Sequence, residues 1–459
     1  MTIDFNKPTH IYFIGIGGAN MSSLASILMD KGFKVSGSDA VKSGNTERLE
    51  REGASIWYGQ TEPHITGTED AVVFNAAIKE DNPDMVAAKE KNIQRVNRAE
   101  FLGELMKNYG TAIGISGTHG KTSTTNMISE ILMAADLDPT LSLGGILPSI
   151  NSTARDGGRD YFVFEACEYT NSFLHFFPTI EVILNIEEDH LDFFKDLADI
   201  RHSFNKFANR LPEDGTLVIN GEIDNIKEIV GDFRGHVITY GFDPSCDYYA
   251  TDLTLSPEAH PSFICHEKET GLEFPVKLSL TGKHNASNSL SAIAVARTLK
   301  IPAETIAKAL GGATGAKRRF EFKGEVNGVK VIDDFAHHPT EIKATLTAAK
   351  ACPHKDLWVA FQPHTYTRTK AFLNEFAEVL SLADHVVLAD VYAAREKDEY
   401  GCNTSNLFEL MKKNGSDVHY FSDFKDIEKF LLANCTKGDL LITMGAGNIV
   451  NIADSLTSK

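Results

Sequence analysis

A glycine-rich turn between an apolar strand and a helix constrains this chain more than any other feature. Residues 111–116 are mostly apolar, Gly117-Thr-His-Gly-Lys-Thr122 turns the chain, and a helix is predicted from Thr122 onward. In such a turn, backbone N–H groups at the helix N-terminus hold phosphate oxygens. Lys121 would reach the outer phosphates, and the Thr122 hydroxyl would bind Mg²⁺. The turn therefore predicts an α/β fold that carries a nucleotide-phosphate site.

The turn departs from the strict pattern G-x-x-x-x-G-K-[ST] at one place. Ile115 stands where the pattern has its first glycine, and Gly114 and Gly117 supply the flexibility instead. Taken alone, the motif indicates nucleotide binding and leaves the reaction open. A loop whose glycines merely turn the chain is the alternative, but the order of strand, G-K-T and helix favours the phosphate site.

Length, charge and cysteine content limit the class of protein. The chain has 459 residues, too many for one core, so about two to four domains are expected. A formal net charge of −18 argues against general binding to nucleic acid or membrane surfaces. The six cysteines are scattered without a C-x-x-C pair, which is typical of reduced thiols. No apolar run approaches the roughly 20 residues of a membrane-spanning helix, so we expect a soluble cytoplasmic protein without membrane insertion.

The N-terminal segment reads as a βαβ unit. A strand at 11–16 runs into Gly15-Ile-Gly-Gly18, a helix follows to about Lys31, and a second strand at 33–38 ends at Asp39. This resembles a dinucleotide fingerprint, with an acid about 20 residues on for a ribose. Asn20 replaces the third glycine, so a nicotinamide dehydrogenase stays open as an alternative. A further strand at 72–78 would bring Asn75 to the same crevice.

Two apolar strands of the middle segment end in ligand-type side chains. The first, 161–168, carries Glu165 and Glu168, and the second, 181–190, ends in two glutamates, an aspartate and His190. Because the carboxyl ends of parallel strands meet the ligand crevice, these groups would face the phosphate turn, where Mg²⁺ prefers oxygen ligands. We expect Glu165 and His190 to be metal ligands and interpret Glu187 and Glu188 as surface acids.

The rest of the middle segment changes pattern. Short alternating runs between 245 and 280 are typical of antiparallel edge strands. A helix then opens near 281 with His284, Asn285 and Asn288 on its first turns. One Asn could cap this helix, but the three together favour a base or ribose pocket.

A third α/β unit follows a glycine-rich stretch at 311–315, which we interpret as a hinge. The strand at 329–334 leads into His337 and His338, which have no third metal ligand at useful spacing, so binding or catalysis is favoured over a structural metal. The next strand, 357–362, leads to Arg368, whose planar fork suits a substrate carboxylate.

Eight motifs, in order along nearly the whole chain, resemble those of the Mur ligases, ATP-dependent amide-forming enzymes of peptidoglycan precursor synthesis. The matching stretches are Gly15-Ile-Gly-Gly with Met21-Ser22, Gly117-Thr-His-Gly-Lys-Thr122, Glu165-x-x-Glu168, Asp189-His-Leu-Asp192, His284-Asn-x-x-Asn288, Arg318-Arg-Phe320, Asp333-Asp-Phe-Ala-His-His-Pro339 and Gln362-Pro-His364. The branch that the chain most resembles joins L-alanine to UDP-N-acetylmuramate.

The resemblance implies three α/β domains. Residues 1–108 would form a Rossmann-like domain for UDP-N-acetylmuramate, 109–314 a P-loop ATPase-like central domain for ATP, and 315–459 a Rossmann-like domain for the amino acid and ATP. It also implies ATP and two Mg²⁺ ions, the small-molecule substrates UDP-N-acetylmuramate and L-alanine, no nucleic acid, and a monomer or homodimer.

The resemblance further assigns site residues. The catalytic residues would be Lys121, Arg319 and His337. The ATP-binding residues would be Gly117, Thr118, His119, Gly120, Lys121, Thr122, Ser123, Asn285, Asn288, Arg319 and Asp334. Those for the UDP-sugar would be Gly15, Gly17, Gly18, Ser38, Asp39 and Asn75. Those for the amino acid would be His337, His364 and Arg368, and the metal ligands would be Thr122, Glu165 and His190.

Two departures from the family pattern and three rivals bear on this interpretation. Thr365 stands where many relatives have Arg, which puts one amino-acid contact in doubt. Phe204 and Asn205 occupy the place of a carbamylated lysine, with Lys206 slightly off register, which fits the alanine-adding branch. A ligase that recycles murein tripeptide shares these motifs. A nicotinamide dehydrogenase would explain residues 11–39 but leave the phosphate turn and the His-rich strand ends without a role. The complete set of Lys121, Thr122, Glu165 and His190 argues against a non-catalytic nucleotide-binding regulator.

Overall fold

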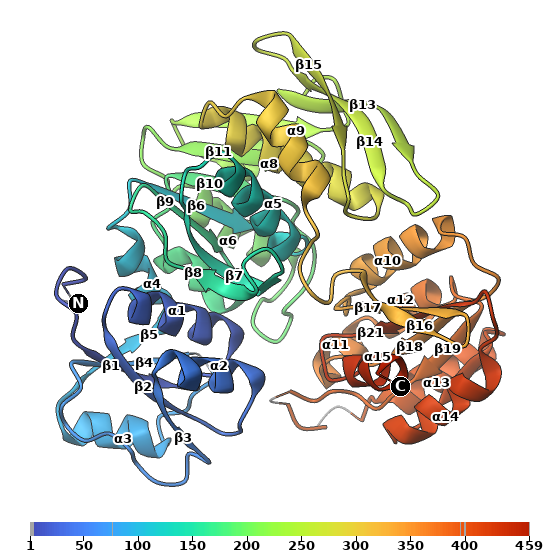
Figure 1. Ribbon diagram of the computed structural model, residues 1–459, viewed down its shortest axis with the longest axis horizontal. Coiled ribbons are helices and arrows are strands. Elements are labelled where there is room, and N and C mark those ends of the chain that lie inside the picture. Colours follow the sequence, from blue (N-terminus) through green and yellow to red (C-terminus); the bar gives the residue numbers. More distant parts are fainter. Residues whose placement is uncertain (1–3, 76, 395, 399–400, 459) are drawn as a thin grey trace.

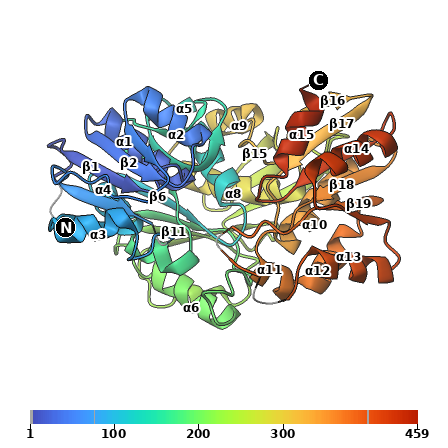
Figure 2. The same ribbon diagram turned by 90° about the horizontal axis from the view of Figure 1, so that it is seen from below.

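The protein folds into three lobes, each built around its own β-sheet (Figure 1). The computed structural model describes residues 4–75, 77–394, 396–398 and 401–458. The chain runs through the lobes in order, and a view from below shows the C-terminal lobe beside the other two (Figure 2). In the described part of the chain, no helix is both long enough and apolar enough to cross a membrane.

The N-terminal lobe is a doubly wound unit. Its five parallel strands have the order β3-β2-β1-β4-β5, with the topological switch between β1 and β4, where ligands bind in such sheets. The elements are β1 (His10–Ile14), α1 (Ala19–Asp30), β2 (Lys34–Asp39), α2 (Gly44–Glu52), β3 (Ser55–Tyr58), β4 (Ala71–Phe74), α3 (Pro83–Glu90), β5 (Gln94–Asn97) and α4 (Arg98–Met106).

The central lobe contains a ten-stranded sheet with the order β15-β14-β13-β12-β11-β10-β6-β9-β7-β8. Strand β6 lies between β10 and β9, and the three are parallel, so their carboxyl ends meet at one edge. The elements are β6 (Thr111–Ser116), α5 (Lys121–Ala134), β7 (Thr140–Leu147), β8 (Ser152–Arg155), β9 (Tyr161–Glu165), the 3₁₀ segment η1 (Tyr169–His175), β10 (Ile180–Ile183), α6 (Leu197–Ala208), β11 (Thr216–Asn220), α7 (Ile226–Val230), β12 (His236–Gly241), β13 (Tyr248–Leu255), β14 (Pro261–Glu267), β15 (Leu272–Lys277), α8 (Lys283–Thr298) and α9 (Ala303–Gly312).

The C-terminal lobe has a six-stranded sheet with the order β16-β17-β21-β18-β19-β20, parallel except for the β16–β17 pair. Its elements are β16 (Glu321–Val326), β17 (Val329–Asp334), α10 (Pro339–Ala351), β18 (Leu357–Phe361), α11 (Tyr366–Ala371), α12 (Leu373–Leu380), β19 (His385–Leu388), α13 (Thr404–Lys413), β20 (Val418–Tyr420), α14 (Phe424–Asn434), β21 (Leu440–Met444) and α15 (Val450–Thr457).

The hydrophobic cores divide differently from the sheets. One buried cluster joins the first two lobes, since Phe5 and Phe101 belong to it together with Phe162 and Phe204. The two clusters of the C-terminal lobe, by contrast, contain only residues from 320 onward among those described. The first two lobes therefore share apolar packing, and the third meets them mainly through polar side chains.

Three α/β units, as predicted, make up the chain, and β13, β14 and β15 are the expected antiparallel edge strands. Several predicted strand ends were wrong, since β1 stops at Ile14 and β9 at Glu165; the two largest errors are at β4, which stops at Phe74, and at β10, which stops at Ile183. In both places the apolar run continues past the last strand pair into a loop that carries ligand-type side chains. The expected hinge at 311–315 also begins inside α9, which continues through Gly312.

Candidate active site

The glycine-rich turn lies between β6 and α5, at the carboxyl edge of the central sheet. Ile115, where the strict motif has glycine, is still inside β6 and fully buried. Gly120 precedes α5 with a φ of +86°, a backbone conformation that glycine adopts without strain, and no side chain caps this helix. The loop after β10 braces the turn, because the backbone N–H of His119 donates to Asn185 Oδ1 at 2.8 Å. Within the described residues, the N–H groups at the start of α5 thus remain for a phosphate.

Lys121 is held by the carboxylate of Glu168, a residue that the sequence prediction left without a role. Its Nζ lies 3.0 Å from Glu168 Oε2 and also donates to the carbonyl oxygens of Gly117 and Thr118. Burial alone would lower the pKa of Lys121, but the negative charge of Glu168 outweighs it and raises the pKa. Lys121 is therefore a fixed cation at the mouth of the phosphate turn.

The predicted ligands of the first Mg²⁺ flank one glycine pair on β7. Glu165, at the end of β9, accepts a hydrogen bond from the Gly144 N–H at 2.8 Å. A Cβ at Gly144 would lie 2.5 Å from both Glu165 oxygens, and one at Gly145 would lie 3.3 Å from Thr122 Cγ2. The two oxygen-bearing side chains thus converge where a hydroxyl and a carboxylate suit a hard cation.

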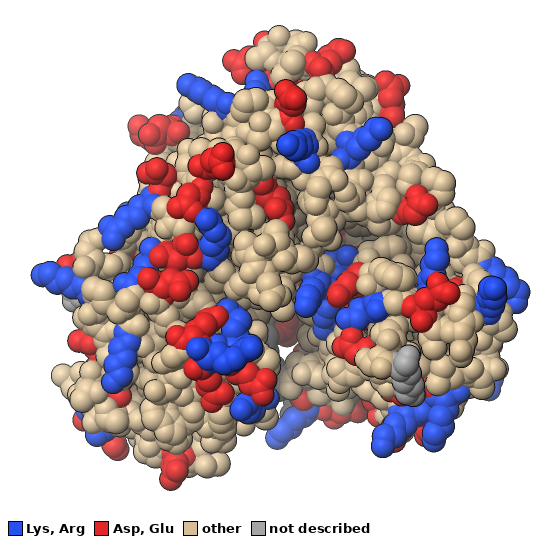
Figure 3. Space-filling model, viewed as in Figure 1, with Lys and Arg blue, Asp and Glu red and all other residues tan. Residues whose placement is uncertain are grey.

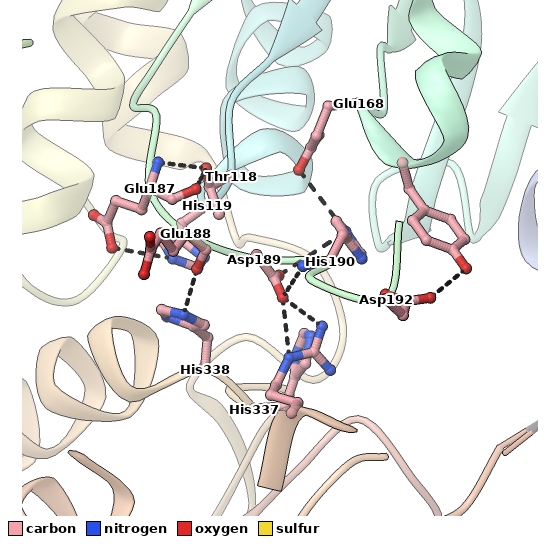
Figure 4. A network of polar contacts seen from close by, with 12 residues as sticks. Thr118, His119, Glu168, Glu187, Glu188, Asp189, His190, Asp192, His337 and His338 are labelled. Atoms are coloured by element: carbon pink, nitrogen blue, oxygen red, sulfur yellow. Dashed lines mark hydrogen bonds and ion pairs between the residues drawn. The ribbon is translucent and has the colours of Figure 1, made fainter. Parts of the chain in front are cut away.

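His190 lies in the loop that follows β10, close to a second carboxylate (Figure 4). Its Nε2 is 3.8 Å from Glu168 Oε1, and its backbone has a φ of +53°, a left-handed conformation for a non-glycine residue. Burial lowers the pKa of His190 and favours the neutral imidazole that a metal needs. Glu168 therefore connects the predicted second metal ligand with Lys121.

A cavity of about 160 Å³ lies between the central and C-terminal lobes. Side chains from α5, from the start of α8 and from α10 line it, so neither lobe closes it alone. Its lining includes the predicted residues His119, Gly120, Ser123, Asn285, Asn288, Arg319 and Asp334, together with His284, Glu187 and Glu341. In Figure 3 the surface is hollowed where the lobes meet, and acidic and basic residues are interspersed around it.

His119 sits between two carboxylates from different lobes. Its Nε2 is 3.5 Å from Glu187 and its Nδ1 is 3.3 Å from Glu341 on α10. Burial would lower the pKa of His119, but these carboxylates outweigh it and raise the pKa to about 9. Glu187 also accepts a hydrogen bond from the Thr340 hydroxyl at 2.6 Å. The interpretation of Glu187 as a bystander surface acid was wrong, because the fold brings α10 against it; the side chain of Glu188 is exposed, as expected.

Around His119, the fold brings two possible metal-ligating side chains close to His338, which the spacing of residues in the sequence did not predict. Ligand atoms of His119, Glu187 and His338 lie within 4.8 Å of one another. Both ring nitrogens of His338 already have hydrogen-bond partners, however. Its Nε2 lies 3.1 Å from the Glu188 carbonyl, and its Nδ1 accepts from the Thr340 N–H at the start of α10. A protonated His119 between two carboxylates accounts for this cluster as a polar contact between lobes.

The adjacent arginines 318 and 319 have different surroundings. Arg318 donates to Asp333 at 2.9 Å and to two carbonyl oxygens beyond β21, so its guanidinium is part of the fold. Arg319 lines the cavity, and its Nη1 is 3.9 Å from Glu341. Asp334 accepts from the N–H groups of Phe320 and Ala336, and burial raises its pKa to about 6.

His337, His364 and Arg368 gather on the C-terminal side of the junction. The rings of His337 and His364 lie 5.5 Å apart, and Arg368 Nη1 lies 3.1 Å from His364 Nδ1. Burial lowers the pKa of His337 to about 4, so its ring is neutral near pH 7. Its Nδ1 lies 3.0 Å from the Phe335 carbonyl, which only accepts, so the proton sits on Nδ1 and Nε2 keeps a lone pair.

The residues predicted for the UDP-sugar divide into a scaffold and a pocket. Ser38 is fully buried and donates to Asp84 at 2.6 Å, and Asp39 accepts from the Gly17 N–H at 2.8 Å. Gly18 and Asn75, in contrast, line a cavity of about 280 Å³ between the first two lobes. Gly15 has a φ of +77° and begins the turn toward α1.

Arg98 lines this second cavity and was missed from the sequence. It is the first residue of α4, lines the cavity together with Gly18 and Cys167, and forms no hydrogen bond or ion pair in the described part of the chain. Burial lowers the pKa of its guanidinium. The N-terminus of α1 at the same cavity has no side-chain cap. Both features favour an anionic ligand.

Three family models match successive parts of the chain. The model described as the Mur ligase family, catalytic domain, matches residues 10–110, the Mur ligase middle domain matches 115–296, and the Mur ligase, glutamate ligase domain, matches 318–447.

Individual relatives match from end to end. A UDP-N-acetylmuramate–L-alanine ligase of Agathobacter rectalis is 54% identical over 457 residues, covering 100% of this chain and 99% of the relative. A crystal structure of a UDP-N-acetylmuramate–alanine ligase from Thermotoga maritima has a TM-score of 0.82 at 27% identity and covers 98% of both chains. A murein peptide ligase from Psychrobacter arcticus has a TM-score of 0.76 at 26% identity, with 98% coverage of both.

Proposed function

The chain belongs to the Mur ligase family, and on that premise we propose that it joins L-alanine to the lactyl carboxylate of UDP-N-acetylmuramate. ATP is converted to ADP and phosphate in the reaction. One observation carries the proposal most of the way: the phosphate turn and His190, at the carboxyl edge of the central sheet, share cavities with Arg319 and Arg368 of the next lobe. Such a junction can hold a triphosphate, a carboxylate and an amine together.

Each lobe has a proposed ligand and boundary. Residues 1–108 bind the UDP part of the nucleotide sugar, 109–314 bind ATP, and 315–459 bind the amino acid and complete the ATP site. The cavity between the first two lobes supports the first assignment, because Arg98 and the uncapped N-terminus of α1 both favour a diphosphate. The cavity lined by Asn285, Asn288 and Arg319 supports the second.

Two Mg²⁺ ions belong to this proposal. Thr122 and Glu165 would hold one, and His190 would hold the other. The donor set fits, because the side chains of Glu165 and Thr122 flank Gly144 and Gly145, and the imidazole of His190 is neutral beside Glu168. Bound Mg²⁺ would neutralise phosphate charge during transfer.

The chain's own groups explain how the first step becomes favourable. A lactyl carboxylate oxygen attacks the γ-phosphorus of ATP, the bond to the bridging oxygen breaks, and ADP leaves, which yields an acyl phosphate. Carboxylate and phosphate are both anionic, so fixed positive charge must screen their repulsion. Lys121 supplies it from the phosphate turn, and Arg319 supplies it from the cavity between the lobes.

The second step needs a neutral amine. The L-alanine nitrogen attacks the acyl carbon, phosphate leaves, and the nitrogen gives up a proton. His337 is suited to accept that proton, because its ring is neutral and Nε2 keeps a lone pair. Closure of the C-terminal lobe keeps water from the acyl phosphate.

A ligase that adds murein tripeptide to the same nucleotide sugar is the second candidate. Its solved relative is less similar in fold, with a TM-score of 0.76 against 0.82 for the alanine ligase. The 54% identity to a curated alanine ligase also favours L-alanine.

Phosphate release from ATP, measured with UDP-N-acetylmuramate and a panel of acceptors, tests the proposal. The panel contains L-alanine, glycine, L-serine and murein tripeptide. We expect release that requires the nucleotide sugar and is fastest with L-alanine. Release only with tripeptide, or release independent of the nucleotide sugar, would contradict the proposal.

Two further expectations accompany it. Two of the substrates, ATP and UDP-N-acetylmuramate, are nucleotides, so we place the reaction in the cytoplasm. The protein acts as a monomer or a homodimer, which light scattering coupled to size exclusion distinguishes.

A further inference from the structure

A buried ion pair joins the loop after β10 to the short helix α11 across the junction of the second and third lobes. Asp189 Oδ1 accepts from Arg368 Nε at 3.1 Å and from Nη2 at 2.8 Å. Each side chain is only 9% exposed. Asp189 belongs to one of the sequence motifs, but no role was predicted for it, whereas Arg368 was expected to bind a substrate carboxylate.

The pairing leaves part of the guanidinium unused. An arginine has five N–H groups in a rigid fork. Asp189 takes the side formed by Nε and Nη2, and Nη1 faces the ring and carbonyl oxygen of His364 at 3.1 and 3.3 Å. At least one N–H, on Nη2, stays available at the end of the fork. A ligand carboxylate can therefore approach Arg368 without expelling Asp189.

Asp189 is itself fixed by its neighbour. The backbone N–H of His190 donates to Asp189 Oδ1 at 2.7 Å. The aspartate thus turns back on its own loop and presents a carboxylate that is already oriented toward the C-terminal lobe.

Apart from the contacts of Nη1 with His364 in its own lobe, Arg368 is oriented by Asp189. Helix α11 spans only Tyr366–Ala371, and within the described residues the one carboxylate that hydrogen-bonds Arg368 is Asp189, from another lobe. A flexible arginine loses side-chain entropy when a ligand orders it, and a fixed partner removes that cost beforehand. The orientation of this arginine consequently depends on contact between the lobes.

We propose that Asp189 is a positioning residue that aligns Arg368 for the α-carboxylate of the amino acid, so that this subsite is complete only when the two lobes are in contact. The proposal rests on the proposed function. Asp189 does not touch the substrate; it acts through Arg368. Recognition of the acceptor's carboxylate is therefore assembled from both lobes.

The test compares L-alanine with L-alaninamide, which has the same amine and methyl group but no carboxylate. The quantity measured is the ratio of kcat/KM for the two acceptors, with ATP and UDP-N-acetylmuramate saturating. In Asp189→Asn we expect this ratio to fall by about tenfold or more, because a misaligned arginine no longer distinguishes carboxylate from amide. The KM values for ATP and UDP-N-acetylmuramate should change by less than about twofold.

Glu188→Gln is the matched control, since this neighbouring acid has an exposed side chain with no recorded contact in the described structure. It should keep the wild-type ratio. If Asp189→Asn does not fold, Asp189→Glu replaces it, because the extra methylene displaces the carboxylate and should also lower the ratio.

A wild-type ratio in the folded Asp189 variant would overturn the positioning role. A raised ratio would do so as well, since it would mean that Asp189 competes with the substrate for Arg368. An equal loss for both acceptors would indicate a purely structural contribution and would also contradict the proposal. If the wild-type enzyme shows no turnover dependent on L-alanine, the proposed function itself is wrong, and the two failures are distinguished.

Discussion

Two cations at the junction of the central and C-terminal lobes are held by carboxylates of the chain itself. Lys121 contacts Glu168, and Arg368 contacts Asp189. A chain with a net charge of −18 can thus present fixed positive groups to anionic ligands, because a carboxylate holds each of these two cations in place. Arg98, at the cavity between the first two lobes, lacks such a partner in the described part of the chain.

Replacing Arg98 should therefore weaken nucleotide-sugar binding selectively. We expect Arg98→Gln to raise the KM for UDP-N-acetylmuramate by about tenfold or more, because a charge-assisted contact to an anion is lost. The KM for ATP should stay near the wild-type value. Steady-state kinetics with each substrate varied in turn measure both, and Arg95→Gln on the adjacent exposed ion pair is the control. An unchanged KM for the nucleotide sugar would contradict the role of Arg98.

Site residues that belong to a compact motif could be predicted, and those supplied by tertiary contact could not. Lys121 and Thr122 lie where the glycine turn predicts, because their neighbours in sequence fix the backbone. Glu341 contacts His119 only because α10 packs across the junction, and no spacing in the sequence records that approach. Arg98 reads as an ordinary first residue of a helix until the fold places it beside Cys167.

At the level of elements, adjacent strands of the central sheet create the site by ending together. Strands β6, β9 and β10 are parallel neighbours, so the phosphate turn, Glu165 and the loop with His190 follow from three strand ends. The order of apolar runs predicted this arrangement, since parallel strands share one carboxyl edge. The extents of β4 and β10 could not be predicted, because the apolar run does not stop where strand pairing stops.

Strand β7 contributes a glycine that leaves room for a metal ligand. In Gly144→Ala the new methyl group would lie 2.5 Å from the Glu165 oxygens and displace them. We expect the Mg²⁺ concentration for half-maximal activity to rise by about tenfold or more, as when the support of a metal ligand is removed. A Mg²⁺ titration of ATP turnover measures this. Gly312→Ala, whose added methyl meets no atom within 4 Å, is the control. An unchanged Mg²⁺ requirement would contradict the assignment of Glu165.

Strand β10 contains a buried carboxyl group with no recorded partner. Glu181 is 0% exposed, and neither oxygen has a hydrogen-bond partner among the described residues. Burial raises its pKa well above the ordinary value. Glu181→Leu should increase the free energy of unfolding at pH 7 by roughly 1–3 kcal/mol, because the desolvation of a polar group is removed. Thermal unfolding measures the change, and ligase activity should be retained.

The stabilisation expected for Glu181→Leu depends on pH in a definite direction. Because burial raises the pKa of Glu181, the folded chain binds this proton more tightly than the unfolded chain, and deprotonation above the ordinary pKa favours unfolding. This cost disappears as the pH falls toward the ordinary pKa of 4.5, so the advantage of Glu181→Leu should shrink there. A variant less stable than the wild type at pH 7 would show that Glu181 has a stabilising role.

For the whole molecule, the division of the cores indicates which lobe moves. The first two lobes share a buried apolar cluster, whereas the third has clusters of its own in the described chain. Polar pairs hold the third lobe to the second, among them His119 with Glu341. Polar contacts between lobes are replaced by contacts to a ligand more readily than apolar packing is. We therefore expect the C-terminal lobe to open and close.

His119 should make this junction sensitive to alkaline pH. Its pKa is raised to about 9 in the folded protein from an ordinary value of 6.5. The protonated ring therefore stabilises the folded protein fully below pH 6.5, and this contribution, at most a few kcal/mol, is lost as the pH rises through 9. The midpoint of thermal unfolding should fall between pH 6.5 and 9.5 in the wild type and change less in His119→Gln. Parallel losses in both proteins would contradict the role of His119.

The transfer of oxygen from the nucleotide sugar to phosphate tests the central claim most directly. UDP-N-acetylmuramate labelled with ¹⁸O in its lactyl carboxylate is incubated with ATP, L-alanine and the enzyme, and the phosphate is analysed by mass spectrometry. If the carboxylate attacks the γ-phosphorus, each phosphate released carries one ¹⁸O from the substrate, because the amine displaces the acyl oxygen together with the phosphate. Phosphate without ¹⁸O, formed alongside the amide product, would contradict an acyl-phosphate intermediate at this site.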